Sequence, residues 1–124
     1  MVFGTFDLLH EGHLFLIRHA SKRGDVTVVV AESENVKRIK GRLPIETNEE
    51  RMKAIQLAFP SVQVILGDKK DFLAPLKIVT PDLLILGYDQ KLPPGVTETD
   101  LPCRVERAPA HRPDIFKSSL MKKR

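Results

Sequence analysis

The feature that most constrains the fold is a continuous, largely β-branched run at residues 26–31, which reads Val-Thr-Val-Val-Val-Ala. A strand with one wet face alternates apolar and polar residues. This run does not alternate, so it predicts a strand buried on both faces, as in a parallel sheet. Further apolar runs at 62–66 and 83–86 predict two more strands, and the short, mixed segment 103–108 is expected to form another. Residues 1–3 read as the end of a very short first strand.

Helical patterns separate these strands at residues 10–22, 47–58 and 72–79. The second of them begins with a capping box, in which Thr47 is the N-cap and Glu50 the third helical residue. Strands that alternate with helices predict the α/β class. We expect a Rossmann-like, open, doubly wound parallel sheet of about five strands, with helices on both faces. The length of 124 residues fits a single domain over 1–124.

Three segments are interpreted differently. Residues 32–42 are polar and charged, and their basic residues cluster around Gly41, so we expect a loop there. Residues 91–102 are rich in proline and also predict a loop. Residues 116–124 predict a short helix, because Ser118 and Ser119 are good N-cap residues.

Charge and composition exclude several classes of function. The chain has 20 basic and 16 acidic residues, a formal charge of +4, which suits a small polyanionic substrate and, more weakly, nucleic acid. One Tyr and no Trp argue against an RNA-binding protein. With one cysteine, no apolar run of membrane-spanning length and no secretory leader, we expect a cytoplasmic protein. The very short first strand suggests that the chain is trimmed at its start.

Residues 3–13 follow the first strand directly and read Phe-Gly-Thr-Phe-Asp-Leu-Leu-His-Glu-Gly-His. If a helix begins near His10, then His10 and His13 share a face of its first turn, beside unpaired backbone N–H groups and the positive end of the dipole. A phosphate would be held there, and Gly12, which lacks a Cβ, would let it approach the backbone. Residues 4–6 would form a flexible turn. The alternative is that the histidines only cap a helix.

Residues 87–90, Gly-Tyr-Asp-Gln, follow another predicted strand. In open parallel sheets, ligands bind beyond the carboxyl ends of strands, where the strand order reverses. We therefore expect residues 3–13 and 87–90 to share one crevice, although about 75 residues separate them.

The pattern G-T-F-D followed by H-x-G-H resembles the signature of the cytidylyltransferase-like nucleotidyltransferases. This resemblance implies transfer of a nucleotidyl group from a nucleoside triphosphate to a phosphorylated acceptor, with release of pyrophosphate. It implies that His10, His13 and Lys40 act in catalysis. It also implies a nucleotide-binding set: Gly4, Thr5, Phe6, His10, Glu11, Gly12, His13, Arg42, Asp89, Ser118 and Ser119.

For the basic residues Lys40, Arg42 and Arg51, the sequence also allows a role other than the one that the resemblance implies. Lys40 and Arg42 match a basic pair that grips the triphosphate in this family, whereas a charge run alone more often forms a solvated face. Arg51 lies in the first turn of the second helix. There it either forms a surface salt bridge with a neighbouring Glu or supports the phosphate site.

A divalent cation, Mg²⁺ by preference, is expected to bridge phosphate oxygens, and no protein residues are assigned to hold it. Asp7 is interpreted as supporting the turn through hydrogen bonds, and Asp89 as contacting the ribose hydroxyls or the base. Residues 117–123 resemble a family motif I-S-S-T-x-x-R that touches the phosphates. The two serines are kept there, but Leu replaces the Thr and Lys replaces the Arg.

Residues 39–45, 48–52 and 86–90 are most similar to archaeal-type FAD synthetases, which transfer AMP from ATP to FMN. Glycerol-3-phosphate cytidylyltransferases, which use CTP, are similar over the same stretch and remain the alternative. A non-catalytic nucleotide-binding module is the alternative from another class. The resemblance also implies a homodimer. For the bulky flavin, the sequence offers only the proline-rich loop and the C-terminal tail as candidate binding segments.

Overall fold

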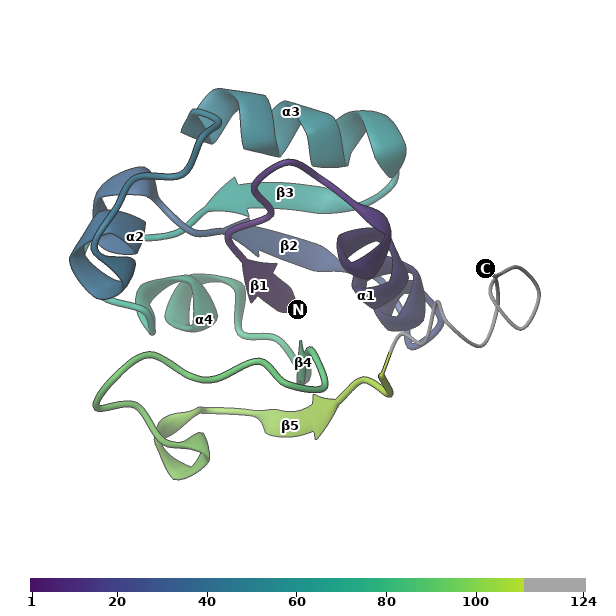
Figure 1. The fold of residues 1–124 in the computed structure, drawn as a ribbon. Helices are drawn as coiled ribbons and strands as arrows, with labels where there is room; N and C mark the ends of the chain where they lie inside the picture. The colour runs from purple at the N-terminus through teal and green to yellow at the C-terminus, as the bar shows by residue number, and fades with distance from the viewer. Residues whose placement is uncertain (111–124) are drawn as a thin grey trace.

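The computed structural model describes residues 1–110, and within them five short strands form the centre of the fold (Figure 1). They are β1 (Val2–Gly4), β2 (Thr27–Val30), β3 (Gln63–Leu66), β4 (Leu83–Leu86) and β5 (Arg104–Arg107). Each lies within a residue or two of its predicted position. The predicted helix at 116–124, with Ser118 and Ser119, lies outside the described residues.

All pairings between these strands are parallel. β2 lies between β1 and β3, with Val2 opposite Val28, and β4 pairs with β5 in a second sheet. Hydrogen bonds of Met1 join the two sheets, because its carbonyl accepts from Ile85 N at 2.9 Å and its amino group donates to Leu83 O at 2.8 Å. The spatial order is thus β3-β2-β1-β4-β5. The chain reverses direction across the sheet between β1 and β4, as the doubly wound prediction requires.

The two faces of the sheet are covered by different helices. Val28 packs with Ile17 of α1 (Glu11–Ser21) and Ile55 of α3 (Asn48–Ala58), all fully buried. Val29 packs on the opposite side with Leu76 of α4 (Ala74–Val79). Figure 1 shows α1 and α4 on opposite sides of β1. The burial of β2 on both faces, which its apolar run predicts, is therefore confirmed.

The prediction of a loop over residues 32–42 is wrong, because Ser33–Lys40 form helix α2. The Glu32 side chain caps it by accepting from the N–H groups of Glu34 and Asn35. Gly41 ends it in the left-handed region at φ 85°, a conformation that glycine adopts without strain. Only Asn35 and Val36 of this helix are buried, so the sequence carries almost no apolar period to reveal it.

Two smaller elements refine the predictions. α4 begins at Ala74, two residues later than predicted, and Pro75 falls in its first turn, where proline is tolerated. Just before the helix, the Asp71 carboxylate accepts from the backbone N–H of Leu73 at 2.9 Å. The proline-rich loop contains a short 3-10 helix, η1 (Glu98–Asp100). In the described part of the chain, no helix is both long and apolar enough to cross a membrane.

Candidate active site

A cleft of about 670 Å³ opens at the carboxyl ends of β1 and β4, where the strand order reverses. Its walls come from the loop after β1, the start of α1, the end of α2 with residues 42–45, and the segments 87–90 and 108–109. The expectation that residues 3–13 and 87–90 share one crevice is confirmed. No residue of the proline-rich loop 91–102 lines this cleft, so that part of the expected flavin-binding surface does not lie there.

The cleft brings together most of the residues expected from the sequence. Those that line it are Gly4, Thr5, Phe6, His10, Gly12, His13, Lys40, Arg42 and Asp89. Glu11 is the exception within the described residues, because its side chain is exposed outside the cleft and lies 3.8 Å from Arg18. Ser118 and Ser119 lie beyond the described part of the chain.

The two histidines cap α1 reciprocally. His10 is the N-cap residue, and its Nδ1 accepts from the backbone N–H of Gly12 at 3.1 Å. His13 returns the contact, because its Nδ1 accepts from the backbone N–H of His10 at 3.2 Å. The rings stack with centroids 3.7 Å apart, so they form one rigid unit at the head of the cleft.

This capping fixes which nitrogen of each ring can act on a ligand. With Nδ1 accepting a hydrogen bond, a neutral imidazole carries its proton on Nε2. Burial and, to a smaller extent, the charge of the neighbouring His10 together lower the pKa of His13 to about 4, while Asp7 opposes the shift. His13 is therefore a neutral Nε2–H donor near pH 7. The backbone N–H groups of His10 and Gly12, which the sequence suggests as phosphate donors, are instead taken by the imidazoles.

Local packing explains the glycines of the motif. A Cβ at Gly12 would lie 3.1 Å from His10 Cε1, closer than ordinary contacts, and would displace the ring. The turn expected over residues 4–6 begins one residue later, at Thr5, because Gly4 is the last residue of β1. The left-handed conformations fall instead on Phe6 and Leu8, at φ 52° and 51°. For residues with a Cβ such conformations cost about 1–2 kcal/mol each, so the surrounding contacts must hold this loop in place.

Two carboxylates hold the strained loop against the segment that follows α2. Asp7 accepts from the backbone N–H groups of Ile45 at 2.8 Å and Glu46 at 2.9 Å. Glu46 accepts in return from Leu8 N at 2.8 Å. Although desolvation opposes it, these backbone donors, with Arg51 and His13, lower the pKa of Asp7. Asp7 is thus a supporting residue, as expected, but what it supports is the loop of the neighbouring wall.

Arg51 is fully buried, so the alternative of a surface salt bridge is wrong. Its guanidinium donates to atoms from three stretches of the chain, at residues 5, 31–33 and 46–48. The acceptors are Thr5 O at 2.9 Å, Ala31 O at 2.7 Å, Ser33 Oγ at 2.9 Å, Glu46 O at 3.2 Å and Asn48 Oδ1 at 2.6 Å. It holds the carboxyl ends of β1 and β2 beside the start of α3. It does not line the cleft, so it acts on the cleft only through the segments that it holds together.

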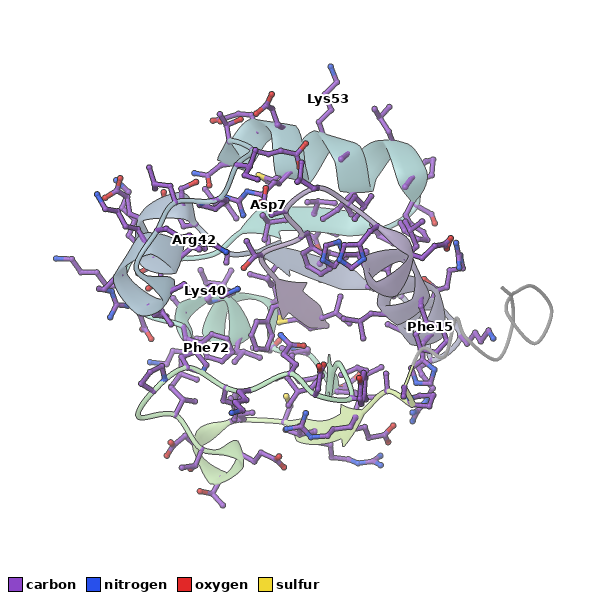
Figure 2. All side chains as sticks on the ribbon, in the orientation of Figure 1. Asp7, Phe15, Lys40, Arg42, Lys53 and Phe72 are labelled. Carbon is purple, nitrogen blue, oxygen red and sulfur yellow. The ribbon has the colours of Figure 1, made fainter. Side chains whose placement is uncertain are left out.

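The basic residues lie on the wall formed by α2. Lys40 is the last residue of α2, and Lys40 Nζ donates to Thr5 Oγ1, in the loop after β1, at 3.2 Å. Figure 2 shows Lys40 and Arg42 extending from the end of α2 toward this loop. Arg42 is exposed and lines the cleft. Two cations thus face the same space as the histidine pair.

On the opposite wall, two residues that the sequence did not single out for this role shape segment 87–90. Gln90 accepts from Gly87 N at 2.9 Å and donates to Phe3 O at 2.9 Å, so it links the ends of β4 and β1. Arg107 donates to Gly87 O at 2.9 Å and to Gln90 O at 2.7 Å. These contacts form only because β4 lies beside β1 and β5, and the residues next to Gln90 and Arg107 in the sequence do not reveal which strands are neighbours.

The donor set fits a divalent cation that is bound mainly by a substrate. Within residues 1–110, no group of three His, Cys, Asp or Glu side chains is arranged to hold a metal ion. Asp7 is already engaged by backbone donors, which leaves Asp89 as an exposed carboxylate in the cleft. Mg²⁺ is usually bound by substrate phosphates and water with few protein ligands, so the phosphates of a bound triphosphate would supply most of its ligands.

The sequence model of a family described as cytidylyltransferase-like matches residues 1–121, and the chain belongs to this family. Among individual relatives, the FAD synthase of Methanosphaerula palustris is 40% identical over 102 residues, which cover 82% of this chain and 65% of that protein. The FAD synthase of Natronomonas pharaonis is 38% identical over 117 residues, 90% of this chain and 82% of that one. The chain thus spans roughly two thirds to four fifths of these two relatives.

A solved structure agrees with the fold. The crystal structure of the lipopolysaccharide core biosynthesis protein from Thermoplasma volcanium superposes with a TM-score of 0.78 and is 28% identical. The match covers 90% of this chain and 95% of that one. The prediction of a Rossmann-like sheet from this family is confirmed.

Proposed function

We propose that this chain is an FAD synthase, which transfers AMP from ATP to FMN. Relatives that bear this name match most of the chain at about 40% identity. The single structural observation that carries the proposal is the reciprocal histidine cap. It leaves the Nε2–H group of each ring available beside a cleft of about 670 Å³, which is also lined by Lys40 and Arg42.

The reaction needs alignment and charge neutralisation more than covalent help from the protein. A phosphate oxygen of FMN attacks the α-phosphorus of ATP and forms a new P–O bond. The bond between the α-phosphorus and the bridging oxygen of the β-phosphate breaks, and the β- and γ-phosphates leave together as pyrophosphate. In this proposal His10 and His13 donate hydrogen bonds to the phosphoryl oxygens, where negative charge increases. Lys40 and Arg42 neutralise the triphosphate. Mg²⁺ supplies further charge neutralisation on the phosphates.

The nucleoside is assigned to the wall formed by segment 87–90. Asp89 is exposed there and free to accept from ribose hydroxyls or from the amino group of the base. Adenine and cytosine both carry such an amino group, so this contact does not select the donor by itself. The cytidylyltransferase alternative, with glycerol 3-phosphate as acceptor, uses the same phosphate contacts.

The experiment that tests the proposal offers ATP and CTP separately with FMN, glycerol 3-phosphate and a sugar phosphate. Pyrophosphate release and FAD formation are measured. FAD formed from ATP and FMN supports the proposal. Turnover only with CTP and glycerol 3-phosphate overturns the choice of substrates, and nucleotide binding without turnover indicates a binding module.

The proposal also includes a cytoplasmic homodimer formed from single-domain chains. A pair of chains would add surface to a cleft that is open to solvent on a chain of only 14.0 kDa. Sedimentation at working concentration tests this part. A mass of one chain contradicts the dimer without affecting the assignment of the reaction.

A further inference from the structure

Three consecutive apolar residues form one rim of the cleft. Leu43 and Ile45 are 52% and 77% exposed, and Pro44 between them is half-buried. All three line the cleft, and we call them the apolar lip. Single exposed hydrophobic residues are ordinary, but a contiguous group that borders a cleft marks a surface for an apolar ligand.

The lip is held in its exposed position by polar contacts at its base. Asp7 accepts from the N–H groups of Ile45 and Glu46, and Arg51 Nε donates to Glu46 O at 3.2 Å. Gly41, just before the lip, has a φ of 85°. The lip is therefore a preformed surface, and binding to it does not require that the loop first become ordered.

The apolar lip lies next to two cationic residues, an arrangement that suits an acceptor with one charged end and one apolar end. Lys40 and Arg42, both in the cleft, come directly before it. FMN has a phosphate at one end and a large, planar, mostly apolar ring system at the other. The proline-rich loop does not line the cleft, and the wall with Asp89 is assigned to the nucleoside, whereas the lip follows the two cations and presents exposed apolar side chains to the cleft.

We infer that Leu43, Pro44 and Ile45 are the subsite for the isoalloxazine ring and set the preference of the enzyme for a flavin acceptor. This inference rests on the proposed function. Aromatic rings gain much of their binding energy by burying their faces against apolar side chains. A glycerol phosphate or a small sugar phosphate has nothing to place on this surface.

The test replaces both exposed side chains, in the variant Leu43→Ser with Ile45→Ser. We expect the KM for FMN, and the Kd measured by quenching of flavin fluorescence without ATP, to rise about tenfold or more. The KM for ATP should stay within about twofold of the wild-type value. Both residues are exposed, so the fold should be kept, which circular dichroism verifies.

The matched control is Ile78→Ser on α4, which removes an isoleucine that is 80% exposed and does not line the cleft. Its KM for FMN should be unchanged. An unchanged KM and Kd for FMN in the lip variant would overturn the inference, and a rise in the KM for ATP instead would assign the lip to adenine. If the wild type forms no FAD from ATP and FMN, the proposed function itself has failed, which is a distinct result.

Discussion

At the scale of single residues, the histidine pair combines a structural and a chemical role. Each Nδ1 is used by the backbone at the start of α1, so each Nε2–H remains for a ligand. A lysine at either position would add charge but could not cap the helix. Imidazole can do both, which explains in physical terms why two histidines occupy positions three apart at a helix start.

This dual role can be separated by substitution. Asparagine caps helices as well as any residue, so His10→Asn should keep the stability of the fold within about 1 kcal/mol. It cannot place a donor where Nε2–H lies, and loss of one such electrostatic donor typically lowers kcat about 10²–10³-fold. The variant His19→Ala, which alters a histidine outside the cleft, should keep normal turnover. Near-normal kcat in His10→Asn would mean that His10 only caps the helix.

The lowered pKa of His13 predicts how stability depends on pH. Its pKa is about 4 in the folded protein against 6.5 for an ordinary histidine, so between these values the unfolded chain binds more protons. This contribution to stability is complete above pH 6.5 and is lost as the pH falls toward about 4. The urea midpoint of the wild type should therefore fall over this range more steeply than that of His13→Gln. Parallel curves would contradict a buried neutral His13.

At the scale of elements, the sequence predicted the strands well and α2 poorly. The strands and the large helices carry long apolar runs or a capping box, and these signals depend only on neighbouring residues. In α2, the signals are a Glu cap and a Gly stop around a polar segment, which also fit a loop. The role of Arg51 could not be predicted either, because three of its five acceptors, on Thr5, Ala31 and Ser33, lie on segments that only the fold brings together.

Arg51 links several elements, so its removal should lower stability before it affects chemistry. Arg51→Met would leave buried oxygens such as Thr5 O and Ala31 O without this donor, and a buried polar group left unsatisfied typically costs about 1–3 kcal/mol. In urea unfolding, the stability of Arg51→Lys should lie between that of Arg51→Met and that of the wild type. Arg18→Ala removes an exposed arginine and should cost less than about 1 kcal/mol. Equal effects of the Arg51 and Arg18 variants would contradict this linking role.

The two basic residues at the end of α2 are predicted to stabilise the bound triphosphate by their positive charge. Lys40→Ala and Arg42→Ala should each raise the KM for the triphosphate, or lower kcat, by about tenfold or more, since charged hydrogen bonds contribute about 1.5–3 kcal/mol. Wild-type activity should weaken as salt increases, because salt screens these charges. Lys37→Ala removes an exposed lysine of the same helix that does not line the cleft. If all three variants behave alike, the basic cluster is only a solvated face.

At the scale of the whole molecule, the cleft lies where the two sheets meet, and within the described residues few hydrogen bonds join β1 to β4. Apart from the hydrogen bonds of Met1, the Gln90 side chain joins Phe3 O to Gly87 N across the floor of the cleft. The sequence predicted that residues 3–13 and 87–90 would meet, because strand order in doubly wound sheets follows general rules. It did not predict what fixes their separation.

Gln90 should therefore control both stability and the width of the cleft. Gln90→Ala leaves two backbone groups without their side-chain partner, which costs about 1–3 kcal/mol, and should raise the KM for ATP because the two walls are no longer held together. Gln90→Glu keeps an acceptor for Gly87 N but sets a carboxylate against Phe3 O, so it should be at least as harmful. Gln63→Ala alters an exposed glutamine of β3 outside the cleft and serves as the matched control in urea unfolding and steady-state kinetics. A Gln90→Ala enzyme that loses stability but keeps its KM for ATP would show that the other contacts alone hold the two walls in register.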